Sequence, residues 1–169
     1  MKKLYFKQKI MKITDHYEVY NEDQEIEYYV DEDFKFISFR ANVTDADGEY
    51  VFSIEKDIYT PFIKFNINFR DGSNIILKNK FSILKNKMSI EGDDLSLRLE
   101  EDYFNYDVAV YNENETIAVI KRKYLSFSDT YELTIFDDYY TDIILAIAIG
   151  VDCIRDNNER KSQNDRKKR

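Results

Sequence analysis

A run near the C-terminal end, from Ile143 to Val151, contains no polar side chain. A helix that is apolar on every side must be buried on every side, in a protein core or in lipid. Because a membrane-spanning helix needs about 20 apolar residues, this run is too short to cross a bilayer and is expected in a core. In such a short run the hydrophobic period cannot be recognised, so the pattern alone does not distinguish a helix from a strand. Helix is favoured by Asp137 and Asp138 as potential caps and by Asp142 in the first turn. The predicted core residues are Ile143, Ile144, Leu145, Ala146, Ile147, Ala148, Ile149 and Val151.

The chain from Leu4 to Phe136 alternates short apolar runs with polar turns, about every 8–12 residues, as all-β proteins do. The high counts of Tyr (14) and Phe (12) favour strands. With only 4 Gly and 1 Pro, the turns must rely on Asn and Asp, as at 44–49 and 70–73. The pattern predicts about twelve strands. Closing them into a barrel would remove unpaired edges and enclose the apolar helix. The predicted fold is therefore mainly β: a closed antiparallel barrel around a central hydrophobic C-terminal α-helix.

Charge is unevenly distributed along the chain, whose net charge is -8. Residues 155–169 carry +4, which leaves -12 for residues 1–154. This predicts one barrel domain over residues 1–156, followed by a basic, disordered tail over 157–169. Contact of the tail with anionic lipid or nucleic acid is the alternative. An acidic body would be repelled by phosphates, so nucleic acid is not an expected partner.

The single cysteine and the N-terminal residues indicate in which cellular compartment the protein is expected. Cys153 is the single cysteine, so no internal disulfide is expected, and its place beside the apolar run predicts a buried small side chain. Lys7, Lys9 and Lys12 interrupt any apolar signal-peptide region. We expect a cytoplasmic protein with no transmembrane segment, with peripheral contact to a membrane as a further option.

Catalytic and metal-binding patterns are sparse. His16 is the sole histidine, so a zinc site or a Cys–His couple is not expected. The stretch 45–48 resembles part of a calcium loop, but aligning its glycine places Val43 and Ile54 at ligand positions. The acidic groups at 31–33, 93–94 and 100–102 are interpreted as solvated turns. We expect a non-enzymatic protein with no cofactor and no metal.

Basic residues recur in three predicted strands, each followed by a short corner and a return strand. The units begin at Lys7, Lys78 and Lys121, and in each a second lysine precedes the return-strand residue by eight positions. Simple alternation, with lysine outward and apolar residues inward, accounts for this pattern. The alternative is a cationic stripe formed by strands that lie side by side. The candidate ligand-binding residues are Lys7, Lys9, Lys78, Lys80, Lys121, Arg122 and Lys123.

Several stretches together resemble the LURP-one-related family, whose members have the tubby C-terminal-like fold. They are Tyr5 to Lys9, Phe81 to Gly92, Ala118 to Lys123, Ser126 to Tyr131, and Leu145 to Ile149 with Asp152. The resemblance covers about Tyr5 to Asp156 and implies a twelve-stranded barrel around a hydrophobic helix. Bacterial members often carry tryptophan where Phe127 and Phe104 stand here; those changes keep the apolar bulk.

The resemblance implies less about function. Tubby proteins bind phosphoinositides and related scramblases act on membrane lipids, but those functional residues have no counterpart that can be placed on this sequence. Our leading hypothesis is a non-catalytic binding or regulatory module for anionic phospholipid or a protein partner. Lipid scrambling, or an enzyme whose site is not visible in the sequence, are the alternatives.

Overall fold

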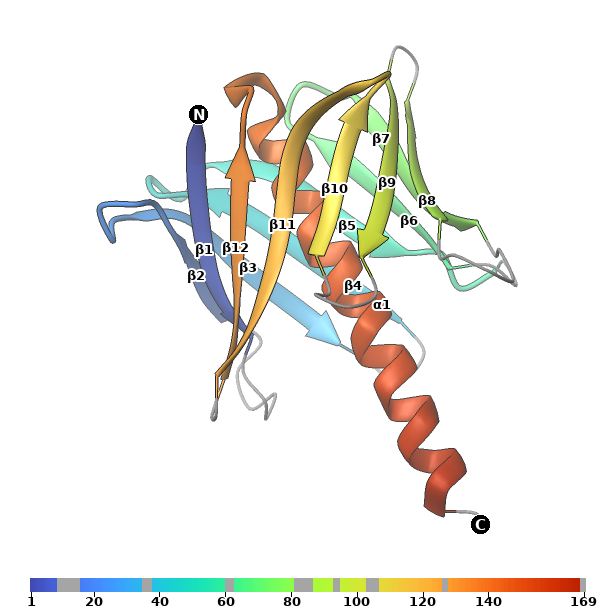
Figure 1. Ribbon diagram of the computed structural model, residues 1–169. Helices are drawn as coiled ribbons and strands as arrows, with labels where there is room; N and C mark the ends of the chain where they lie inside the picture. Colours follow the sequence, from blue (N-terminus) through green and yellow to red (C-terminus); the bar gives the residue numbers. More distant parts are fainter. Residues whose placement is uncertain are drawn as a thin grey trace.

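The computed structural model describes residues 1–8, 16–34, 38–59, 63–80, 87–92, 95–102, 107–125 and 128–167. Within them, twelve antiparallel strands close into a barrel around one long C-terminal helix (Figure 1). The strands are β1 (Lys2–Gln8), β2 (His16–Tyr20), β3 (Ile26–Phe34), β4 (Phe39–Asp45), β5 (Tyr50–Lys56), β6 (Lys64–Phe69), β7 (Asn74–Lys80), β8 (Lys87–Gly92), β9 (Ser96–Asp102), β10 (Asp107–Asn112), β11 (Glu115–Leu125) and β12 (Ser128–Ile135). This confirms the predicted fold class.

The barrel has a simple up-and-down order, because every strand pairs with its neighbours in sequence. Closure is made by β1 and β12, which pair in register from Lys2 opposite Ile135 to Gln8 opposite Asp129. The first and last strands of the barrel therefore lie side by side (Figure 1). The face formed by β1, β12 and β11 consequently combines residues from the two ends of the chain.

Alternation of side chains and tight turns explain the strands. On β9, Leu97 and Leu99 are buried while Arg98 between them is exposed, as the two-residue period of a strand requires. The predicted hairpin turns form with glycine at positive φ, 81° at Gly48 and 87° at Gly72, a conformation that side chains disfavour. The Asp45 carboxylate accepts hydrogen bonds from the backbone N–H groups of Asp47 and Glu49, which closes the first of these turns.

Inside the barrel runs α1 (Thr141–Lys167), preceded by the short 3₁₀ helix η1 (Asp138–Tyr140). The predicted core residues from Ile144 to Ile149, and Val151, are buried, and Ile143 is partly buried against the same core. The predicted central helix is therefore confirmed, as is the burial of Cys153. Asp137 caps η1 by accepting a hydrogen bond from the backbone N–H of Tyr139.

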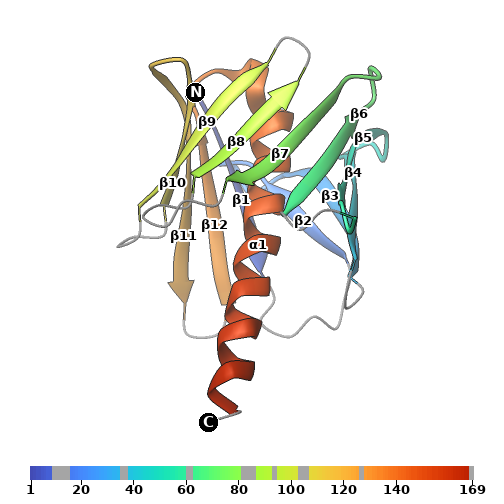
Figure 2. The same ribbon diagram turned by 90° about the vertical axis from the view of Figure 1, so that its right-hand side faces the viewer.

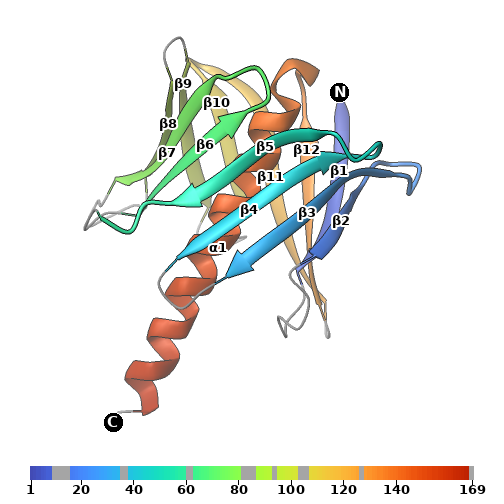
Figure 3. The ribbon, with the colours of Figure 1, turned by 180° about the vertical axis from the view of Figure 1, so that it is seen from behind.

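The C-terminal half of α1 extends beyond the ends of the strands (Figures 2 and 3). The sequence predicts a disordered tail over 157–169, whereas the backbone of α1 continues as a helix to Lys167. No glycine or proline interrupts residues 151–167, and Arg, Lys, Gln and Glu are good helix formers. Arg155, which begins the basic stretch 155–169 but falls within the predicted domain 1–156, is only 8% exposed and belongs to the barrel interior.

Two acidic groups interpreted as turns are in fact strand residues. Residues 31–33 continue β3, and 100–102 end β9. The pairing explains this, since Asp31 lies opposite both His16 and Asn42 and so has strands on both sides. Asp31 and Asp33 are exposed, so water solvates their charges at the end of the barrel. The third group, 93–94, lies outside the described residues.

Candidate functional site

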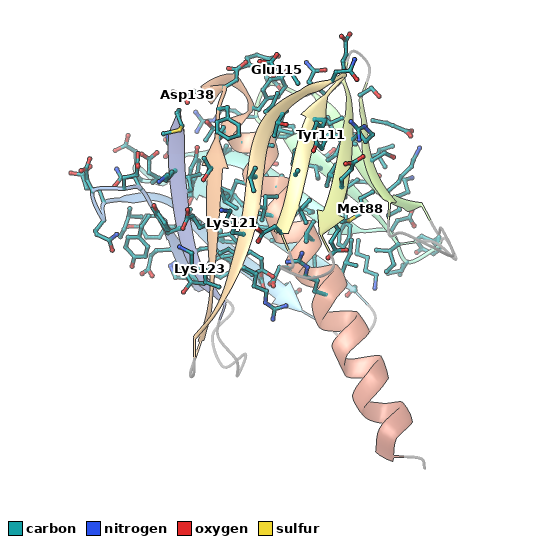
Figure 4. All side chains as sticks on the ribbon, viewed as in Figure 1. Met88, Tyr111, Glu115, Lys121, Lys123 and Asp138 are labelled. Atoms are coloured by element: carbon teal, nitrogen blue, oxygen red, sulfur yellow. The ribbon has the colours of Figure 1, made fainter. Side chains whose placement is uncertain are left out.

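The outer face of β1, β12 and β11 brings basic side chains together across three neighbouring strands. Pairing aligns Lys3 with Thr134 and Val119, and Tyr5 with Glu132 and Lys121. The next row aligns Lys7, Thr130 and Lys123. Figure 4 shows Lys121 and Lys123 along β11. We call the outward side chains of these rows the lysine face; the described members are Lys3, Tyr5, Val119, Lys121, Lys123, Thr130, Glu132 and Thr134.

Glu132 lies at the centre of the lysine face. Lys123 donates a hydrogen bond to its carboxylate, and this bond, with the charges of Lys123, Lys3 and Lys121, lowers the pKa of Glu132. The same hydrogen bond raises the pKa of the Lys123 ammonium. The Glu132 side chain is only 15% exposed, whereas that of Lys123 is 60% exposed. Three ammonium groups therefore act on one largely covered carboxylate.

The other two lysines of the face differ in their pairing. Lys3 Nζ lies 4.0 Å from Oε1 of Glu22, an exposed residue of the β2–β3 turn. Lys121 is exposed and forms no ion pair with any residue in the described ranges. In a chain of net charge -8, this surface is thus locally basic. Lysine ammonium groups are common partners for phosphate oxygens.

Among the remaining candidate lysines, only Lys78 has a side chain that the structure describes, and it lies away from this surface. Lys78 lies on β7, four strands from β11 around the barrel, and its ammonium pairs with Glu91 on β8. Residues Lys7 and Lys80 are described only by their backbone, and Lys9 lies outside the described residues. The single stripe considered from sequence is therefore divided between two sides of the barrel, because strand order separates β7 from β1 and β11.

Arg122 lies on the opposite face of β11 from its two lysine neighbours. It is only 7% exposed, and its guanidinium carbon lies 5.9 Å from the centre of the Tyr131 ring inside the barrel. Alternation explains the correction: Lys121 and Lys123 point outward, so the residue between them points inward. The grouping of Arg122 with the surface lysines was wrong.

A second cluster, which the sequence analysis missed, surrounds α1 where the helix leaves the barrel. Tyr131 donates a hydrogen bond to Asp152 (2.8 Å), and Arg155 Nη2 donates one to Glu101 (3.0 Å). Tyr17 donates to Glu32 at 3.0 Å. We call this cluster the polar collar; its members are Tyr17, Glu32, Glu101, Arg122, Tyr131, Asp152 and Arg155.

Burial dominates the electrostatics of the polar collar. It is the main cause that raises the pKa of the Tyr131 phenol far above its usual range. The Asp152 charge raises this pKa further, while Arg122 and Arg155 oppose the shift. Burial likewise raises the pKa of Tyr17, with the charge of Glu32 as the next cause. These tyrosines stay protonated at neutral pH and serve as hydrogen-bond donors.

The polar collar could have been recognised in the sequence from the positions of its residues along the strands. Val19 on β2, Val30 on β3, Leu99 on β9 and Ile120 on β11 are buried. On each of these strands, the next inward-facing residue lies two positions closer to the end of the barrel where α1 leaves it. That residue has a polar side chain. These residues are Tyr17, Glu32, Glu101 and Arg122. The hydrogen bonds from Tyr131 to Asp152 and from Arg155 to Glu101 join the barrel wall to α1, which favours a role for the polar collar in holding the helix within the barrel.

Neither cluster has the pattern of a metal site. Within the described ranges, no group of three or more His, Cys, Asp or Glu side chains could hold a metal ion. His16 Nδ1 lies 2.7 Å from Oδ1 of Asp31, and both side chains are well exposed. Among the residues that the structure describes, no helix is both long enough and apolar enough to cross a membrane.

Comparison with known proteins gives consistent matches over most of the chain. The family model described as LURP-one-related matches residues 2–152. The uncharacterized protein YxjI of Bacillus subtilis (strain 168) is 25% identical over 162 residues, which cover 96% of this chain and 99% of YxjI. The X-ray structure of a protein from Arabidopsis thaliana is similar with a TM-score of 0.56 and 12% identity. That alignment covers 89% of this chain and 91% of the plant protein, and it shows a shared fold.

Proposed function

This chain belongs to the LURP-one-related family, and from that premise we propose that it is a non-catalytic binding module for membrane surfaces rich in anionic phospholipid. One observation carries the proposal: strand pairing gathers Lys3, Lys121 and Lys123 around Glu132 across three adjacent strands. The lysine face is the proposed contact surface. Lys7, which shares a row with Lys123, is proposed to add to it.

The chemistry of lysine supports an anionic partner. Adjacent strands lie about 4.8 Å apart, and β12 lies between β1 and β11. The Cα atoms of lysines on β1 and β11 are therefore about 10 Å apart. That spacing lets several lysines contact different phosphates at one surface. Each lysine near an anionic leaflet contributes about 1 kcal/mol of binding free energy, an effect that salt screens. A broad, flat set of point charges suits a lipid surface better than one enclosed small molecule.

Vesicle co-sedimentation tests the proposal directly. The full chain is mixed with vesicles of phosphatidylcholine alone, or with phosphatidylserine added, over a series of salt concentrations. The test variant is Lys121→Gln with Lys123→Gln. The control is Lys64→Gln with Lys78→Gln, which removes two charges from paired positions on β6 and β7. Both control lysines already pair with acids, as Lys123 does.

The lysine-face variant is expected to lose about 30-fold in affinity for the anionic vesicles, from two lysines at about 1 kcal/mol each. The control variant should bind like the unaltered protein. Equal loss in both variants would mean that net charge, and not this face, sets binding. Absence of binding to anionic vesicles at low salt would overturn the proposal and direct the search to a protein partner.

A further inference from the structure

The lysine face continues into an exposed apolar surface at the end of the barrel opposite the helix exit. The outward residues of β12 follow one another as Glu132, Thr134 and then Phe136, just past the strand. The backbone N–H of Phe136 donates to the Ile117 carbonyl (2.9 Å), which extends the pairing with β11 by one residue. The Phe136 ring is therefore presented in the same direction as Glu132, and the residue is 47% exposed.

Two more exposed apolar side chains belong to the segments next to Phe136, because Lys2 pairs with Ile135 and the Met1 nitrogen lies 3.6 Å from Asp138. Tyr139, three residues later in η1, is 79% exposed, and Met1, next to β1, is 71% exposed. We call Met1, Phe136 and Tyr139 the apolar margin of the lysine face. Large apolar side chains left in water at one place mark a contact surface more often than isolated ones do.

Asp137 and Asp138, which lie between Phe136 and Tyr139 in the sequence, both have local partners. Asp137 accepts a hydrogen bond from the Tyr139 backbone N–H at 3.0 Å. Asp138 Oδ1 lies 3.6 Å from the Met1 α-amino nitrogen, at the end of the barrel marked in Figure 4. The positive α-amino group next to Asp138 reduces the repulsion of that carboxylate by an anionic surface, whereas Asp137 keeps its charge and caps η1.

We propose that the apolar margin enters the membrane interface while the lysine face contacts lipid phosphates. This inference rests on the proposed function and adds an orientation: the barrel lies on its side, with β1, β12 and β11 toward the membrane. Aromatic side chains are favoured at the level of the lipid headgroups, where a ring with a polar edge contacts both apolar and wet surroundings. Lysines beside them supply the charge attraction.

Another exposed aromatic position provides a matched comparison. Tyr59, in the β5–β6 connection, is 92% exposed, with Ile58 beside it. Strand order places β5 and β6 on the other side of the barrel from β11 and β12. In side-on docking, Tyr59 stays in water although its ring is as accessible as those of the apolar margin.

The chain contains no tryptophan, so one substitution creates a single fluorescent reporter. Phe136→Trp is prepared in the full-length protein, with Tyr59→Trp as its control. Emission and acrylamide quenching are measured with phosphatidylserine-containing vesicles, with phosphatidylcholine vesicles and without lipid. With the anionic vesicles, the reporter at position 136 is expected to shift to shorter wavelength and become less quenched. The reporter at position 59 should remain unchanged.

Stable co-sedimentation without any shift at position 136 would overturn this orientation and leave the proposed function standing. Absence of co-sedimentation would overturn both. Equal shifts at both positions would also contradict side-on docking. As a second measure, Phe136→Ser with Tyr139→Ser is expected to weaken vesicle binding about tenfold even at high salt, because the loss is apolar. Unaltered binding of that variant would again overturn the orientation.

Discussion

Tyr131 is the residue that most directly connects the barrel wall to the central helix. Its hydroxyl donates to Asp152, its ring stacks on Phe6 with centroids 4.9 Å apart, and its side chain is fully buried. Tyr131→Phe keeps the ring and leaves the buried Asp152 carboxylate without this donor. We expect a loss of about 1–3 kcal/mol in the free energy of unfolding, measured by urea denaturation. Tyr139→Phe, the same change at an exposed ring, should alter it by less than about 0.5 kcal/mol.

Glu132 gives a prediction on pH dependence. Its pKa is lowered in the folded protein, so the folded state binds fewer protons than the unfolded state as the pH falls. The resulting stabilisation is present above the ordinary glutamate pKa of about 4.3 and is lost as the pH falls through the lowered value. Lys123→Gln removes the main cause, so the Glu132 pKa measured by NMR titration should rise. An unchanged pKa would show that Lys3 and Lys121 suffice to lower it.

The contact between α1 and the barrel wall is tightest at Gly150. A Cβ atom added there would lie 2.5 Å from Leu77 Cδ2 on β7 and 3.3 Å from Ile54 Cδ1 on β5. Leu77 and Ile54 are both fully buried, so neither can move aside freely. The absence of a side chain at this position lets the helix approach these two strands.

At position 150, helix propensity favours alanine over glycine, whereas the close packing against β5 and β7 favours glycine. Gly150→Ala gains about 1 kcal/mol from helix propensity, but overpacking costs about 1–3 kcal/mol. We therefore expect a net loss of stability, read as a lower midpoint in thermal unfolding. Adding Leu77→Val should recover part of the loss by making room. If Gly150→Ala alone raised the midpoint, helix packing against β7 would be looser than the structure shows.

For the whole molecule, the barrel and the extended part of α1 are expected to be separable. Arg155 is the last residue of α1 whose side chain the structure describes; it is buried and donates a hydrogen bond to Glu101 on β9. A chain that ends at residue 156 should keep the unfolding midpoint of the full protein within about 2 °C, because the helix beyond it extends past the ends of the strands (Figures 2 and 3). It should also retain vesicle binding if the lysine face is the contact surface. Loss of binding with an unaltered midpoint would assign the interaction to residues 157–169.

The fold was predictable because its main signals are local. The two-residue alternation of strands such as β9 and the continuous apolar run from Ile143 to Val151 are both visible in the residues themselves. An apolar helix requires an enclosure, and strands without a partner require closure, so a barrel around a helix satisfies both needs. Strand ends were less predictable, since the acidic residues 31–33 and 100–102 resemble turns until pairing partners hold them in strands.

The candidate site depended on information that is not local. Alternation alone could have separated Arg122 from Lys121 and Lys123, because the two-residue period is a property of the strand. Strand order decided that Lys3 and Lys121 meet around Glu132 while Lys78 lies on another side of the barrel. The sequence by itself thus determined which residues face inward and outward. Only the tertiary structure decided which of them are neighbours, because register and closure join residues from distant parts of the chain.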